Sequence, residues 1–172
     1  MALVRFRRSR VRRQQCGFVG TGIRRVSFFI ADTSAVIAAY DRAAELHERA
    51  KEYLANSVAV VSPLVFDEID HLLVARFGKD RRTANLVLDD LLTSAEEGAV
   101  LIPAVDRDDL RVAQRIIQQY RGLRLDLADA VNVVLAERYL TNDLLTLDEK
   151  DFRAVRPLTP THVSFRLLLQ DD

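Results

Sequence analysis

The stretch Val26-Ser27-Phe28-Phe29-Ile30-Ala31-Asp32-Thr33-Ser34 decides the fold of this chain. Residues 26–31 form a mostly apolar run of the length expected for a buried strand. Asp32 stands where that strand would end, and two hydroxyl residues follow it at once. Ligands of parallel α/β sheets bind outside the carboxyl ends of the strands. The stretch therefore predicts a first strand and a candidate site at its end.

Strand-like and helical patterns alternate along the rest of the chain. The further strands are expected at residues 58–61, 99–105, 144–147 and 163–169. The helices are expected at residues 35–40, 42–55, 64–77, 79–97, 110–120 and 126–139. This alternation predicts an α/β fold, a three-layer αβα sandwich with a mostly parallel central sheet.

Size and composition favour one folded domain over residues 26–172. The chain has 172 residues, of which 49% are hydrophobic, and this is enough to bury a sizeable core. Its lone cysteine, Cys16, has no partner for an internal disulfide, and no Cys/His cluster indicates zinc. No apolar run approaches the roughly 18 to 20 residues that span a bilayer. We therefore expect a cytoplasmic protein without a membrane partner.

Residues 1–25 form an arginine-rich leader. Residues 1–27 hold eight arginines and no acid, which leaves residues 28–172 with 17 basic and 25 acidic side chains, a net charge of −8. Three interpretations stay open: an arm that binds nucleic acid, an organellar transit peptide, or a disordered or wrongly assigned start, with the natural start at Val26.

Three further acids, Glu68, Asp129 and Asp148, lie at junctions comparable to that of Asp32. If the strands are parallel, all four carboxylates project over one edge of the sheet. Each close pair of such charges repels by about 4 kcal/mol at an effective dielectric constant of about 20. Raised pKa values or a divalent cation must offset this repulsion. Mg²⁺ and Mn²⁺ prefer oxygen ligands and retain water, which can become the nucleophile for phosphodiester hydrolysis.

The order of these motifs resembles the PIN-domain nucleases, and within them the VapC-type ribonuclease toxins of bacterial toxin-antitoxin pairs. The resemblance covers about residues 27 to 160. It rests on Asp32-Thr33-Ser34, the Glu68 helix, Leu127-Ala128-Asp129-Ala130, and Leu145-Thr146-Leu147-Asp148 with Asp151-Phe152. Each piece is weak alone, and the order and spacing make the set fairly specific.

The resemblance implies a role for each matching residue. Asp32, Glu68, Asp129 and Asp148 would bind the metal. Thr33 and Ser34 would orient the first carboxylate or a metal-bound water, and Thr146 matches the polar residue that the family has on its strand. The implied activity is Mg²⁺-dependent cleavage of structured or messenger RNA by a homodimer. A cognate VapB-like antitoxin would inhibit it by placing a basic residue among the carboxylates.

Several acids also have a purely structural interpretation. Asp32 could form an ordinary Asx turn, and Glu68 could lie on a solvated helix face. Asp126 and Asp129 have the spacing of a helix start, so Asp126 is either an accessory metal ligand or a helix cap. Asp148 is preferred to its acidic neighbours because it alone directly follows the apolar run 144–147.

A basic cluster near Gly78 is the candidate RNA-binding surface. Phosphate contacts from such a cluster would give an affinity that depends on salt. The alternative is a solvated junction between two helices. The cluster consists of Arg76, Lys79, Arg81 and Arg82.

Other functions fit the sequence less well. A phosphatase of the haloacid dehalogenase type has a second Asp two residues after its nucleophile, whereas Ser34 occupies that position here. A phospho-receiver domain needs paired acids after the first strand, and Asp32 stands alone. The alternative to a nuclease is a catalytically silent PIN-like scaffold that binds RNA or protein.

Overall fold

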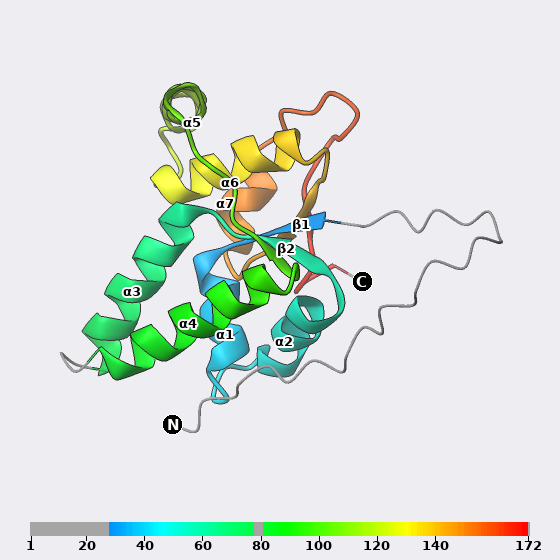
Figure 1. Ribbon diagram of the computed structural model, residues 1–172. Helices are drawn as coiled ribbons and strands as arrows, with labels where there is room; N and C mark the ends of the chain where they lie inside the picture. The colour runs from blue at the N-terminus through cyan, green and yellow to red at the C-terminus, as the bar shows by residue number, and fades with distance from the viewer. Residues whose placement is uncertain (1–27, 78–80, 172) are drawn as a thin grey trace, which may run out of the picture.

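The computed structural model describes residues 28–77 and 81–171, so residues 1–25 and Lys79 lie outside the part discussed below. Figure 1 shows a central sheet with helices on both sides. The strand order is β3-β2-β1-β4-β5, and each neighbouring pair is parallel. The strands are β1 (Phe28–Ala31), β2 (Val58–Val60), β3 (Val100–Leu101), β4 (Asp143–Leu145) and β5 (Arg166–Leu167). The predicted α/β class is confirmed, with a sheet that is parallel throughout.

The helices follow the predicted order with shifted ends. They are α1 (Thr33–Tyr40), α2 (His47–Asn56), α3 (Pro63–Phe77), α4 (Arg82–Glu96), α5 (Arg107–Gln119), α6 (Leu127–Arg138) and α7 (Glu149–Ala154). The expected start of α2 at residue 42 is wrong. Asp41 forms a turn there, since its carboxylate accepts from the Ala43 N–H at 3.0 Å and its carbonyl from the Ala44 N–H at 2.9 Å. The short helix α7 was not expected.

Two strands are much shorter than their apolar runs suggest. In the run 99–105, pairing ends at Leu101, and Pro103 has no N–H with which to continue a ladder. In the run 163–169, only Arg166 and Leu167 pair with β4. The chain then turns, because the Gln170 N–H donates to the Leu167 carbonyl at 3.0 Å.

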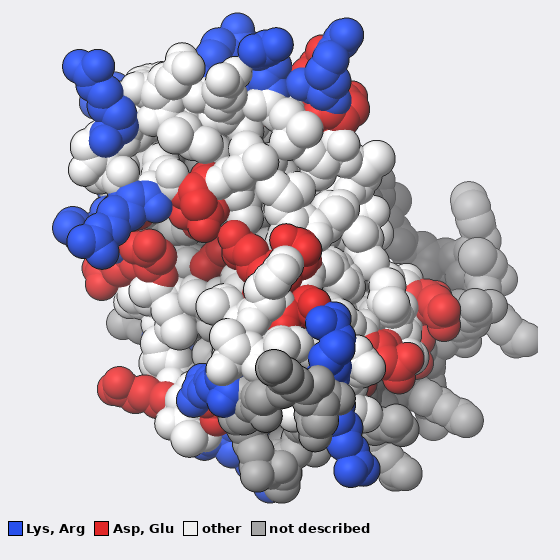
Figure 2. Space-filling view, turned by 90° about the vertical axis from the view of Figure 1, so that its left-hand side faces the viewer, with Lys and Arg blue, Asp and Glu red and all other residues white. Residues whose placement is uncertain are grey.

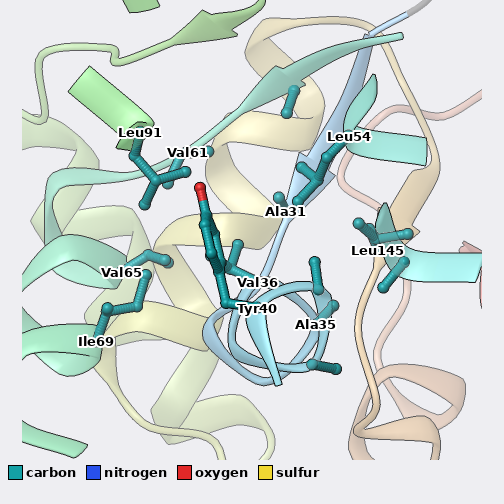
Figure 3. Close-up of a cluster of buried hydrophobic side chains, with 14 of the residues drawn as sticks. Ala31, Ala35, Val36, Tyr40, Leu54, Val61, Val65, Ile69, Leu91 and Leu145 are labelled. Atoms are coloured by element: carbon teal, nitrogen blue, oxygen red, sulfur yellow. The ribbon is translucent and has the colours of Figure 1, made fainter. Parts of the chain in front are cut away.

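Alternate residues of the strands point into two separate cores, which makes the three-layer arrangement. Phe29 and Ala31 face one core, which helices α1 to α4 cover, while Ile30 between them faces the other, which α5, α6 and α7 cover. Figure 3 shows the first core, where the ring of Tyr40 lies among aliphatic side chains. Its hydroxyl donates to the Asp90 carboxylate at 2.8 Å. Within the described residues, no helix is long and apolar enough to cross a membrane.

Candidate active site

The site lies where β1 and β4 end side by side. Ala31 of β1 pairs with Leu145 of β4, and the Asp32 N–H donates to the Leu145 carbonyl at 2.9 Å. Asp32 then leaves the sheet with extended backbone angles and caps α1. Its side chain is buried, with 7% of its surface exposed. The parallel register therefore brings the polar residues after β4 next to Asp32, as the sequence predicted.

Two hydroxyl groups hold one oxygen of Asp32. Ser34 Oγ donates to Asp32 Oδ2 at 2.6 Å, and Thr146 Oγ1 donates to the same oxygen at 2.9 Å. Each hydroxyl also accepts from the backbone after β4: Ser34 Oγ from the Leu147 N–H at 2.9 Å, and Thr146 Oγ1 from the Asp148 N–H at 3.0 Å. These bonds fix the direction of the Asp32 carboxylate.

Glu68 joins the site from α3 and is not on a fully solvated face. Thr33 Oγ1 donates to Glu68 Oε2 at 2.5 Å across 35 residues of sequence. The neighbouring residues of the helix show why Glu68 points this way, since Val65 and Ile69 are fully buried in the core beside it. Thr33 is thus a link between two acids, a role that the sequence did not specify.

Asp126 and Asp129 form a capping box at the start of α6. The Asp129 N–H donates to Asp126 Oδ1 at 3.0 Å, and the Asp126 N–H donates to Asp129 Oδ2 at 3.1 Å. The helix-cap interpretation is therefore correct. It does not remove either acid from the site, because the charge of Asp126 acts on both Glu68 and Asp129.

Asp148 stands at the edge of this arrangement as the cap of α7. Its carboxylate accepts from the Asp151 N–H at 3.1 Å. β4 ends at Leu145, so Asp148 follows three residues after the strand rather than directly after it. Its N–H bond to Thr146 keeps its backbone beside the Asp32 network.

Three acids of the site have raised pKa values: burial raises all three, and neighbouring charges raise two of them further. Burial raises the pKa of Asp32, against the lowering effect of its bonds from Ser34 and Thr146. Burial also raises the pKa of Glu68 to about 6 and that of Asp129 to about 7. For both, the nearby charges of Asp126 and Asp32 add to the shift. A cluster of this kind is typical of functional sites.

The donor set suits a hard divalent cation. The carboxylates of Glu68 and Asp129, whose pKa values are raised in part by the charges of Asp126 and Asp32, would be relieved by such an ion, which prefers oxygen ligands. Among the described residues, Asp32 Oδ1 accepts one long bond, from Asn132 Nδ2 at 3.4 Å. Within residues 28–77 and 81–171, however, no three His, Cys, Asp or Glu side chains are already grouped as they would be around a bound ion.

Sequence reasoning missed Asn132. It lies on α6, is fully buried, and its amide points at Asp32. Its Oδ1 atom is buried with no hydrogen-bond partner, which is uncommon and marks a place where a water could donate. An asparagine in the otherwise apolar run 130–136 was the available signal.

The basic cluster near residue 78 is partly neutralised within the chain. Arg76 Nη2 lies 2.9 Å from Asp41 Oδ2, and Arg81 Nη2 lies 2.5 Å from Asp70 Oδ1. Arg82 is exposed at the start of α4, and Lys79 is outside the described residues. These pairs support the alternative of a solvated helix junction for Arg76 and Arg81.

Figure 2 shows the face on which α3 and the start of α6 lie. Asp and Glu side chains gather across its middle, and Lys and Arg side chains lie along its upper edge, at one side and directly below the acids. We call the acids that act on one another here, Asp32, Glu68, Asp126 and Asp129, the acidic band.

Comparisons with known proteins agree on one family. The profile of the PIN domain matches residues 29–157. Ribonuclease VapC26 of Mycobacterium tuberculosis (strain ATCC 25618 / H37Rv) is 41% identical over 131 residues, which cover 75% of this chain and 93% of that protein. The crystal structure of M. tuberculosis VapC20, a sarcin-ricin loop cleaving toxin, superposes with a TM-score of 0.60. It is 20% identical, and the match covers 72% of this chain and 92% of VapC20, so it supports the fold.

Proposed function

Since the chain belongs to the PIN-domain family and, within it, to the VapC-type proteins, we propose that it is a toxin that cleaves RNA internally with the help of Mg²⁺ or Mn²⁺. The observation that supports this most directly is the grouping of Glu68 and Asp129 with the buried Asp32: burial raises the pKa of all three, and neighbouring charges raise it further for Glu68 and Asp129. The name of VapC26 as a ribonuclease indicates RNA as the substrate.

In this proposal, Asp32, Glu68, Asp129 and Asp148 supply the carboxylates that hold the ion, and Asp126 is an accessory ligand. The bound ion would lower the pKa of a water molecule and so supply the nucleophile. Ser34 and Thr146 keep Asp32 Oδ2 fixed, which leaves Oδ1 as the oxygen with free lone pairs. Thr33, the residue after Asp32, holds the Glu68 carboxylate through its hydroxyl group.

The partners and the setting follow from the same family membership. We propose a cognate VapB-like antitoxin that covers the acids with a basic side chain, a homodimer as the active form, and the cytoplasm as the location. An arginine would suit this antitoxin contact, because its guanidinium binds carboxylates through two parallel bonds. The cluster of Arg76, Lys79, Arg81 and Arg82 is a proposed RNA contact, weakened by the ion pairs of Arg76 and Arg81.

The test is cleavage of total RNA with Mg²⁺ or Mn²⁺ and with a chelator. We expect cleavage only with metal, and we expect Asp32→Asn and Asp129→Asn to lower its rate by more than about 100-fold, since even outer partners of metal ligands are worth about 10- to 100-fold. Circular dichroism would confirm that both variants are folded.

Asp106→Asn is the matched control, because Asp106 also caps a helix through a capping box but lies at α5, next to the far end of α6. It should cleave at the wild-type rate. Equal, chelator-resistant cleavage by the wild type and all variants would refute the mechanism. RNA binding without any cleavage would favour the alternative, a silent PIN-like scaffold.

A further inference from the structure

Residues 110–125 carry positive charge without any acid. The stretch contains Arg111, Arg115, Arg121 and Arg124, and no Asp or Glu. All four arginines are exposed. We call these four side chains the α5 strip. It contrasts with the rest of the described chain, in which acids outnumber basic residues.

The α5 strip leads to the candidate active site. Arg138 at the end of α6 bonds to Asp109 near the start of α5, so the two packed helices run in opposite directions. The far end of α5 therefore lies beside the start of α6. There the strip ends at Arg124, two residues before Asp126 of the acidic band. Figure 2 agrees, since basic side chains line the upper margin of the face whose middle is acidic.

Fold stability does not account for the α5 strip. Several other exposed arginines meet acids, as in the pairs of Arg166 with Asp143 and of Arg153 with Asp171, whereas Arg42 and Arg156 have no ion pair among the described residues. Within residues 28–77 and 81–171, no ion pair involves any arginine of the strip. Arg111 and Arg115 do not complement the helix dipole either, because they lie before the last turn of α5.

We propose that the α5 strip binds the phosphates of the RNA on one side of the cleaved bond. This inference rests on the proposed function, because it takes the acidic band as the place of cleavage. The band repels a polyanion, so the RNA must be held by positive charge beside it. The strip supplies such charge, ends next to the band, and its guanidinium groups suit phosphate oxygens.

The experiment measures binding of a fluorescent single-stranded RNA in chelator, where cleavage is blocked, at several salt concentrations. Arg115→Gln/Arg121→Gln should weaken binding roughly 10-fold near physiological salt. It should also reduce the slope of log K against log salt by about 1.4, since each lost phosphate contact on a single strand contributes about 0.7. With metal, the variant should raise KM and leave kcat unchanged.

The control is Arg42→Gln/Arg107→Gln, which removes the same charge from the turn after α1 and from the start of α5, where Arg107 already pairs with Asp108. It should bind RNA nearly as the wild type does. Equal binding by the two double variants would overturn the role of the strip, even if the wild type cleaves RNA. A wild type that binds through the strip but cleaves nothing would instead refute the proposed function.

Discussion

At the scale of single residues, Asn132 is the buried polar side chain that the sequence did not point to. Its amide donates to Asp32 Oδ1, while Ser34 and Thr146 hold Oδ2. Asn132 thus adds a third donor to the two hydroxyls that direct the Asp32 carboxylate. Asn132 is a positioning residue in this arrangement, since it acts through Asp32.

Asn132→Leu removes this donor with little change of volume. We expect RNA cleavage to fall about 10- to 100-fold, as for other partners of metal ligands. Loss of the bond should also raise the pKa of Asp32, so the acidic limb of the pH–rate profile should move to higher pH. An unchanged pH profile with a merely less stable protein would show that Asn132 is only structural.

The raised pKa of Asp129 predicts how the stability of the metal-free protein depends on pH. Its pKa is about 7 in the folded protein and 3.8 when exposed. Between these values the folded state binds more protons than the unfolded state, so the free energy of unfolding falls as the pH rises from about 4 to 7. Asp129→Asn lacks this titration. Thermal unfolding in chelator should show a Tm advantage of the variant that grows from pH 5 to pH 8; parallel curves would contradict the shift.

At the scale of elements, the two capping boxes allow acids that only cap a helix to be compared with acids that we propose to bind metal. α5 and α6 both begin with an Asp at the cap and another three residues later. Only the box of α6 lies in the acidic band. Asn is as good a cap as Asp, whereas Ala is poorer by about 1 kcal/mol.

Asp126→Asn should therefore keep the wild-type free energy of unfolding but lower RNA cleavage, whereas Asp106→Ala should lose about 1 kcal/mol of stability and keep its cleavage rate. Urea unfolding and initial cleavage rates would measure the two effects. A wild-type rate for Asp126→Asn would restrict Asp126 to capping.

The same elements show what the sequence could predict. Alternating apolar runs predicted the order of strands and helices, and the strand ends predicted that Asp32 and Asp148 lie at one edge of the sheet. Thr146 was identified through the family resemblance alone. The length of β5 was not predictable, because the Asp171 carboxylate that accepts from the Leu167 N–H at 2.8 Å acts through the folded turn. Asn132 was missed because a buried amide in an apolar helix shows its purpose only when its neighbours are known.

At the scale of the whole molecule, one thin sheet joins two cores. Leu144 and Leu145 are adjacent in β4 and almost fully buried, yet they lie in different cores. Leu144→Ala and Leu145→Ala should each reduce the free energy of unfolding by about 2 to 5 kcal/mol. Because both cores share the sheet, calorimetry should still show one transition. Two separate transitions would mean that the layers unfold independently.

The position of β1 in the middle of the sheet affects when the site can form during synthesis. Asp32 is made early, but the Thr146 hydroxyl that holds it is made 114 residues later, together with the neighbouring strand β4. A growing chain therefore carries its first acid for most of translation without the partners that orient it. Cleavage activity should appear only once β4 has left the ribosome, because Asp32 is not oriented before that strand is in place.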